Sequence, residues 1–126
     1  MSERVLIVDD NDDVRRILGL RLSLEGYEVA GAADGREGLA ALRGGRWDLV
    51  LLDLIMPEVD GFEFLAELRG EHDAPPVVVI SQYDDPANRQ RAMALGALCC
   101  VGKSHALARD FPGSLRQWVS GGGRVA

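Results

Sequence analysis

Four aspartates lie within five consecutive positions of this chain, directly after a short apolar run. The run, Val5–Val8, has the length and composition of a buried strand, and residues 9–13 read Asp-Asp-Asn-Asp-Asp. Adjacent carboxylates repel one another by about 4 kcal/mol per pair at about 4 Å and an effective dielectric constant of about 20. Such a cluster indicates a cation or a cationic side chain beside it, and carboxylate oxygens without cysteine or histidine favour Mg²⁺ over zinc as a metal.

Three further apolar runs each lead to a residue that could take part in the same chemistry. They are Leu49–Leu52 followed by Asp53, Val77–Ile80 followed by Ser81, and Leu98–Val101 followed after Gly102 by Lys103. A carboxylate can attack phosphorus and form an aspartyl-phosphate. A metal ion and a lysine then neutralise the oxygens of the transferring group, and a serine hydroxyl can donate to one of them. The residue types therefore indicate phosphoryl transfer.

Each of these residues also has a purely structural interpretation. Asp9 and Asp10 could each cap the following helix, and the two aspartates at 12–13 suit a helix N-terminus. Ser81 by itself could be a turn residue, and Lys103 a solvated charge. The coincidence of such residues at four strand ends favours a common site.

The apolar pattern also predicts the elements that must position these residues. The four runs are nearly continuous, as expected for strands covered on both faces of a parallel sheet, and a weaker alternating run, Tyr27–Ala30, indicates an edge strand. Helical patterns lie between the strands, so the chain consists of five β-α units. We expect an α/β fold, a doubly wound five-stranded parallel sheet in the flavodoxin-like order 2-1-3-4-5. Ligands bind such sheets where the first and third strands end.

Several residues predict where the helices begin and end. Asp34 is expected to cap the second helix, and Asp85-Pro86 to open the fourth because proline suits the first helical turn. Gly26 and Gly96 are expected to end the first and fourth helices. The last helical pattern is irregular, because a proline falls among apolar residues repeated every four positions. It predicts a helix that begins only near Asp110 or is kinked. The residues concerned are Leu107, Phe111, Pro112, Leu115 and Val119.

Length and composition limit the class of protein. With 126 residues, 47% apolar and 27% charged, the chain fits one domain, which we assign to residues 1–119, with 120–126 as a flexible tail or the start of a linker. It lacks an apolar run of the ~18–20 residues that a membrane span needs, and it lacks a signal peptide, so a cytoplasmic location is expected. A net charge of −6 argues against nucleic-acid binding through a basic surface. The adjacent Cys99 and Cys100 are expected to be reduced and buried.

In this order and at these spacings, the residues resemble the receiver (phosphoacceptor) domain of two-component response regulators. The resemblance covers the chain from about Arg4 to about Val119. It rests on Val-Asp-Asp at 8–10, Leu-Leu-Asp-Leu-Ile-Met-Pro at 51–57, Asp-Gly at 60–61, Ser81, Leu-Gly-Ala at 95–97 and Lys103.

The resemblance implies a phosphorylation site with a bound metal. Asp53 is the expected phosphoacceptor, and its phosphoryl group would come from a histidine of a sensor kinase or of a phosphotransfer protein. Asp10, Asp53 and the backbone carbonyl of Ile55 are expected to bind Mg²⁺ directly, and Asp9 to act on it largely through water.

The resemblance also implies how phosphorylation is recognised and reported. Lys103 would pair with Asp53 and then with the phosphoryl group, and Ser81 would hydrogen-bond a phosphoryl oxygen and pull its loop inward. The output would be a population shift in the face formed by the fourth helix, fifth strand and fifth helix, read by an effector protein or domain. This chain would contact neither nucleic acid nor membrane. It would be a phosphoacceptor that assists its own phosphorylation and dephosphorylation rather than an enzyme.

Three positions depart from the family pattern. Ser104 follows the lysine where the family usually has a proline, often after a cis peptide bond. Cys100 stands three residues before the lysine, where the family usually has a tyrosine or phenylalanine that rotates on activation. Gln82 follows the serine where a small residue is usual. The usual coupling between hydroxyl and aromatic ring therefore does not transfer directly to this chain.

Other functions fit parts of the pattern. A phosphatase of the haloacid-dehalogenase type needs a second aspartate two residues after the nucleophile. That position is Ile55 in this chain, which argues against such a phosphatase. A flavin-binding protein of similar topology needs a phosphate-cradling loop after the first strand. Residues 9–13 occupy that place and would repel a phosphate in the absence of a metal, which argues against flavin binding. The main alternative is a pseudo-receiver that acts by protein contact alone. The complete acidic pocket argues against it, and Cys100, Gln82 and Ser104 keep it open.

Ile55 and Tyr83 would flank the path of a water that hydrolyses the aspartyl-phosphate. Because apolar and aromatic side chains orient water poorly, we predict slow self-dephosphorylation and faster decay in the Ile55→Asn variant, which adds a hydrogen-bonding amide. The protein is loaded with phosphate, the donor is removed, and decay is followed. Loss within seconds by the wild type, or equal rates in both proteins, would contradict the prediction.

Overall fold

The computed structural model describes residues 3–56, 58–71, 73–82 and 85–119. The expectations for Tyr83 and for a tail at 120–126 fall outside the described residues.

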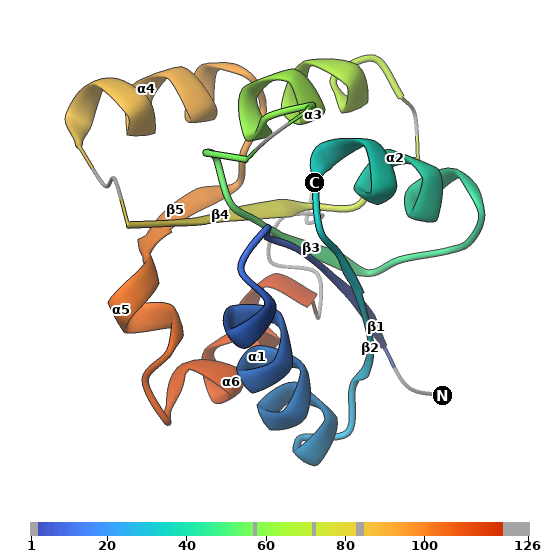
Figure 1. Cartoon of the computed structure of the whole chain (residues 1–126), viewed down its shortest axis with the longest axis vertical. Coiled ribbons are helices and arrows are strands. Elements are labelled where there is room, and N and C mark those ends of the chain that lie inside the picture. Colours follow the sequence, from blue (N-terminus) through green and yellow to red (C-terminus); the bar gives the residue numbers. More distant parts are fainter. Residues whose placement is uncertain (1–2, 57, 72, 83–84, 120–126) are drawn as a thin grey trace.

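Five parallel strands form one sheet in the order β2-β1-β3-β4-β5 (Figure 1). This confirms the predicted α/β fold and its flavodoxin-like strand order. The weak run predicted to be an edge strand does lie at the edge, paired with β1 from Arg4↔Glu28 to Val8↔Ala32. The central strands consist almost entirely of buried valine, leucine and isoleucine, because helices cover both faces. The strands are β1 (Arg4–Val8), β2 (Glu28–Ala32), β3 (Leu49–Leu52), β4 (Val77–Ser81) and β5 (Cys99–Gly102).

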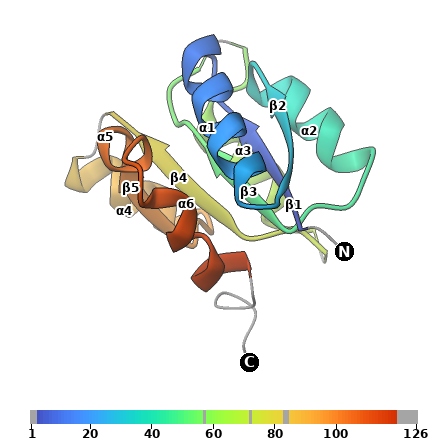
Figure 2. The same cartoon turned by 90° about the horizontal axis from the view of Figure 1, so that it is seen from below.

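The helices divide the core into two layers. One layer contains Leu39, Phe64 and Ala92 from α2, α3 and α4, and the other contains Leu18, Phe111 and their neighbours from α1, α5 and α6. Figure 2 shows the second group in front of the sheet. Among the described residues, no helix is long and apolar enough to cross a membrane. The helices are α1 (Asp12–Leu24), α2 (Gly35–Arg43), α3 (Gly61–Leu68), α4 (Pro86–Ala94), α5 (Lys103–Ala106) and α6 (Phe111–Ser114).

Side-chain caps fix where the helices begin. Asp34 caps α2 as predicted, and α4 opens at Asp85-Pro86 as predicted, with Asp85 as its cap. Each aspartate accepts a hydrogen bond from a backbone N–H three residues later. In α1 the cap is Asn11, whose side chain accepts from the backbone N–H groups of residues 13 and 14. Asp12 and Asp13 then occupy the first turn, where negative charge is favourable. The acidic run is thereby divided, with Asp9 and Asp10 left outside the helix.

The segment after β5 forms two four-residue helices, α5 and α6, and of the residues in the last helical pattern only Phe111 and Pro112 lie within them. The start near Asp110 is correct for α6, where Pro112 lies in the first turn and needs no hydrogen-bond partner. The sequence did not predict α5, which begins at Lys103 directly after β5 and ends at a carbonyl, that of Leu107, bound by Arg21 of α1. Cys99 and Cys100 are free, as expected, but half-buried rather than buried.

Phe111 anchors this divided segment to the sheet. It is 0% exposed and packs between His105 and Trp118. We predict that Phe111→Ala lowers the free energy of unfolding by about 3–5 kcal/mol, because it leaves a cavity. Leu24→Ala in α1, where the side chain is 78% exposed, should change it by about 0.5 kcal/mol or less. Urea denaturation measures both variants, and equal effects would show that Phe111 is no anchor.

Candidate functional site

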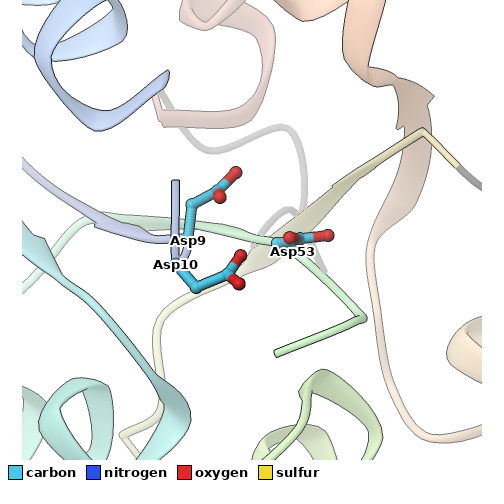
Figure 3. Close-up of side chains that lie close together, drawn as sticks. All are labelled: Asp9, Asp10 and Asp53. Carbon is cyan, nitrogen blue, oxygen red and sulfur yellow. The ribbon is translucent and has the colours of Figure 1, made fainter. Parts of the chain in front are cut away.

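Three carboxylates lie side by side where β1 and β3 end (Figure 3). Asp9 and Asp10 follow β1, Asp53 follows β3, and one oxygen from each lies within 4.8 Å of the other two. The cause is the sheet itself, since β1 and β3 are hydrogen-bonded neighbours whose last residues, Val8 and Leu52, are paired. Residues that follow two paired strand ends must emerge at the same place.

Asp9 is fully buried and held by contacts on every polar group. Its N–H donates to the carbonyl of Ala32 at 3.1 Å, and its Oδ1 accepts from the N–H of Asn11 at 2.9 Å. Its Oδ2 lies 2.9 Å from the Nζ of Lys103. Asp10, one residue on, is exposed to solvent. The two adjacent aspartates thus have different environments.

Lys103 reaches the cluster from the far side of β4. It is the first residue of α5, and its Nζ lies 3.5 Å from Oδ2 of Asp53 as well as 2.9 Å from Oδ2 of Asp9. Burial opposes the charged form of this lysine, but its contacts with Asp9 and Asp53 outweigh burial and raise its pKa. The ammonium therefore stays charged and partly neutralises both buried carboxylates.

Asp53 is only 4% exposed, and its protonation is perturbed accordingly. Burial and then the negative charge of Asp9 raise the pKa of the Asp53 carboxyl to about 6. Lys103 and the N–H of Ile55, which donates to Oδ1 at 3.4 Å, act in the opposite direction without cancelling the rise. This carboxyl is destabilised as an anion unless more positive charge arrives.

Two other predicted site residues lie close along the same sheet edge. Ser81 is 3% exposed and ends β4 in register with Gly102 of β5. Ile55 is 48% exposed beside Asp53.

The three residues that depart from the family pattern lie in the part of the chain that the structure describes. Cys100 is half-buried against the α2–α4 side of the core, and Gln82 and Ser104 are exposed. The bond between Lys103 and Ser104 is trans.

Two glycines hold the segment between β3 and α3 close to the site. Gly61 donates to the carbonyl of Leu54 at 2.9 Å, and a Cβ on it would lie 2.6 Å from the carbonyl oxygen of Asp53. Gly35 at the start of α2 donates to the carbonyl of Val59 at 3.1 Å, and a Cβ there would collide with that oxygen. Larger residues at either position would displace the segment that carries Asp53 and Ile55.

The cluster fits a divalent cation. Asp9, Asp10 and Asp53 are hard oxygen donors, and within the described part of the chain the ammonium of Lys103 pairs with two of them, which leaves an excess of negative charge. Oδ2 of Asp9 is buried and, within the described residues, accepts no hydrogen bond of good geometry despite its ion pair with Lys103. A cation, or water bound to one, would satisfy this oxygen.

The sequence did not predict a role for Arg15. Its guanidinium donates to the backbone carbonyl of Asp9 at 2.5 Å and to the side chain of Asp12. The spacing of Asp12 and Arg15 does indicate an ion pair along a helix. The contact with Asp9 depends on how the helix leaves the strand.

Comparison with known sequences gives a family match over most of the chain. Residues 5–109 match the family described as the response regulator receiver domain. The probable transcriptional regulator ycf27 of Porphyridium aerugineum is 42% identical over 96 residues, which are 76% of this chain and 40% of that protein. The chain therefore spans less than half the length of such curated relatives.

Solved structures show the same fold. The phosphorylated cyanobacterial phytochrome response regulator RcpA is similar at a TM-score of 0.84 and 30% identity, over 95% of this chain and 96% of that chain. The response regulator TrrA of Thermotoga maritima, in complex with Mg²⁺ and BeF, is similar at a TM-score of 0.80 and 29% identity, over 92% and 98% of the two chains.

The raised pKa of Asp53 predicts how stability depends on pH when no metal is bound. The folded-state pKa of about 6 lies above the ordinary value of 3.8, so between these values the folded protein keeps a proton that the unfolded chain has lost. The free energy of unfolding should therefore fall as pH rises through this range.

Asp53→Asn cannot ionise, so we expect it to gain stability over the wild type as pH rises from about 4 to about 6. Urea denaturation of both proteins in EDTA across this range measures the difference. A difference that does not vary with pH would contradict the perturbed pKa.

Proposed function

Because the chain belongs to the family of response regulator receiver domains, we propose that it accepts a phosphoryl group on Asp53 and signals by changing conformation. The donor is a phosphohistidine of a sensor kinase or of a phosphotransfer protein. The observation that carries the proposal is the cluster of three carboxylates joined to Lys103 at the carboxyl end of the sheet.

The residues of the chain supply a nucleophile and a neutralising charge. An oxygen of Asp53 attacks the phosphorus, the bond from phosphorus to the donor imidazole breaks, and the imidazole nitrogen keeps the electron pair. The ammonium of Lys103, already 3.5 Å from Asp53, then pairs with a phosphoryl oxygen. Because Lys103 also binds Asp9, it stays in place when Asp53 is modified.

Mg²⁺, when bound, supplies positive charge to the phosphoryl oxygens and orients them. Asp10, Asp53 and the carbonyl of Ile55 would hold it, and Asp9 would act on it through water. The exposure of Asp10 and the pairing of Asp9 with Lys103 support this division of roles. The complex of TrrA with Mg²⁺ and BeF supports the choice of metal.

The conformational response begins at Ser81. Its hydroxyl donates to a phosphoryl oxygen and draws the end of β4 towards Asp53. The next helix, α4, is suited to follow because little of it is buried, Ala92 being its one buried residue. Its guanidinium contact with α3, between Arg91 and the ring of Phe62, has a distance of 3.9 Å to the ring centre. With Cys100 in place of an aromatic residue, the shift of α4 rather than a rotating ring carries the signal.

An effector reads this shift on the face formed by α4, β5 and α5. In relatives such as ycf27, a transcriptional regulator by name, 60% of the protein lies outside the matched part. The effector is accordingly a further domain or a separate protein, and this acidic chain does not contact nucleic acid itself.

Phosphorylation can be tested directly by intact mass. The protein is mixed with Mg²⁺ and acetyl phosphate, and we expect the mass of one phosphoryl group to be added. Asp53→Asn should abolish the addition because it removes the nucleophile. Asp60→Asn is the matched control, since Asp60 lies in the same segment but caps α3, a role that asparagine also fills.

Two outcomes would replace the proposal. If the wild type gains no phosphate and beryllofluoride also fails to bind, the chain is a pseudo-receiver that acts by contact alone. If it turns over phosphate esters, it is a phosphatase.

A further inference from the structure

Among the described contacts, Arg15 binds the backbone carbonyl of Asp9 rather than the carboxylates of Asp9, Asp10 or Asp53. Its Nη1 donates to the carbonyl oxygen of Asp9 at 2.5 Å, and its Nη2 pairs with Oδ1 of Asp12. The side chain is 21% exposed, whereas Arg16 beside it is 77% exposed and pairs only with Asp13 among the described contacts. Two neighbouring arginines of one helix thus make the same kind of pair with an aspartate three residues earlier, but one of them also reaches the end of β1.

The stem of Arg15 crosses β2 at a glycine. A Cβ on Gly31 would lie 3.1 Å from Cδ of Arg15, closer than most side-chain contacts. Glycine inside a strand is unfavourable, because it loses more chain entropy on folding than other residues. The passage of the Arg15 stem accounts for a glycine at this position.

The bond from Arg15 completes the fixation of Asp9. The N–H and both side-chain oxygens of Asp9 are held by Ala32, Asn11 and Lys103. Its carbonyl is the first to lie beyond the hydrogen-bonded pairs of β1, and Arg15 binds it. This carbonyl belongs to the peptide group that joins Asp9 to Asp10, so holding it sets the direction in which the exposed Asp10 side chain leaves the chain.

We propose that Arg15 is a positioning residue of the phosphoacceptor site: by binding the Asp9 carbonyl, it orients Asp10 towards Asp53 and so creates the site for the divalent cation. The inference rests on the proposed function. It assigns to Arg15 a contribution to cation binding although the residue touches no cation and carries a positive charge.

Because Arg15 is positively charged, its charge and its positioning contact have opposite expected effects on the affinity for Mg²⁺. By Coulomb attraction alone, removing a cationic side chain beside an acidic site should strengthen the binding of Mg²⁺. Loss of a positioning contact should weaken it, and loss of the partner of a metal ligand typically costs 10- to 100-fold in affinity, roughly. The two effects therefore predict opposite changes.

The test is calorimetric titration of the full chain with MgCl₂. We expect Arg15→Met to raise the Kd for Mg²⁺ about tenfold. Arg16→Met, which loses the same charge and the equivalent ion pair with Asp13, should leave the Kd unchanged or lower it. Arg15→Lys keeps the charge and most of the stem but lacks the planar fork that binds two oxygens, so its Kd should lie between those of wild type and Arg15→Met.

Thermal unfolding in EDTA separates positioning from folding. A merely structural role would lower the melting temperature of Arg15→Met while the Kd of the folded protein stays the same. Gly31→Ala provides a second route, because it keeps Arg15 but displaces its stem, and it should raise the Kd severalfold. Gly19→Ala is its control, since a Cβ there makes only an ordinary contact of 3.7 Å with Val29.

A Kd for Arg15→Met that equals or falls below that of Arg16→Met would overturn the inference and leave the proposed function standing. If Arg15→Met does not fold, an unchanged Kd in Gly31→Ala overturns it equally. A wild type that binds no Mg²⁺ would overturn both.

Discussion

Repulsion between carboxylates held at the ends of two neighbouring strands is the constraint on which the rest of this structure depends. Asp9 is fully buried and Asp53 nearly so, and the two share one ammonium, that of Lys103. Burial and repulsion destabilise the anionic form of Asp53, while Lys103 is held in its charged form. The protein thereby maintains an excess of negative charge around two buried carboxylates, which favours the binding of a cation.

The surrounding structure serves to keep these charges in place. Backbone and side-chain groups from β2, α1 and α5 contact Asp9 and hold it in place. They thereby also hold the peptide group that joins Asp9 to Asp10. On the β3 side, Gly61 lets α3 approach the backbone of Asp53 and Leu54 more closely than a Cβ would permit, and Gly35 does the same for α2 at Val59. By contrast α4, through which the signal is expected to pass, has little buried surface.

The sequence predicted the parts of this arrangement that depend on local pattern. Apolar runs predicted all five strands, and the aspartates at 34 and 85 predicted two helix starts, because a cap acts within three residues of itself. The divided C-terminal helix was harder to predict. Its apolar residues keep a helical repeat, but Leu107 ends α5 by giving its carbonyl to Arg21, 86 positions earlier in the chain, and such a competing partner leaves no local signal.

For the site, the sequence by itself determined which chemical groups are present and at which strand ends they emerge. Parallel strands carry residues such as Asp9, Asp10 and Asp53 to one edge whenever the strand order is 2-1-3-4-5, so residue type and order were enough. Only the tertiary structure decided how these groups share their charges. Lys103 lies closer to Asp9 than to Asp53, and Arg15 binds the backbone carbonyl of Asp9 rather than its carboxylate. The physical reason is that ion pairs and hydrogen bonds depend on distances of a few ångströms, which are set by the packing of distant elements.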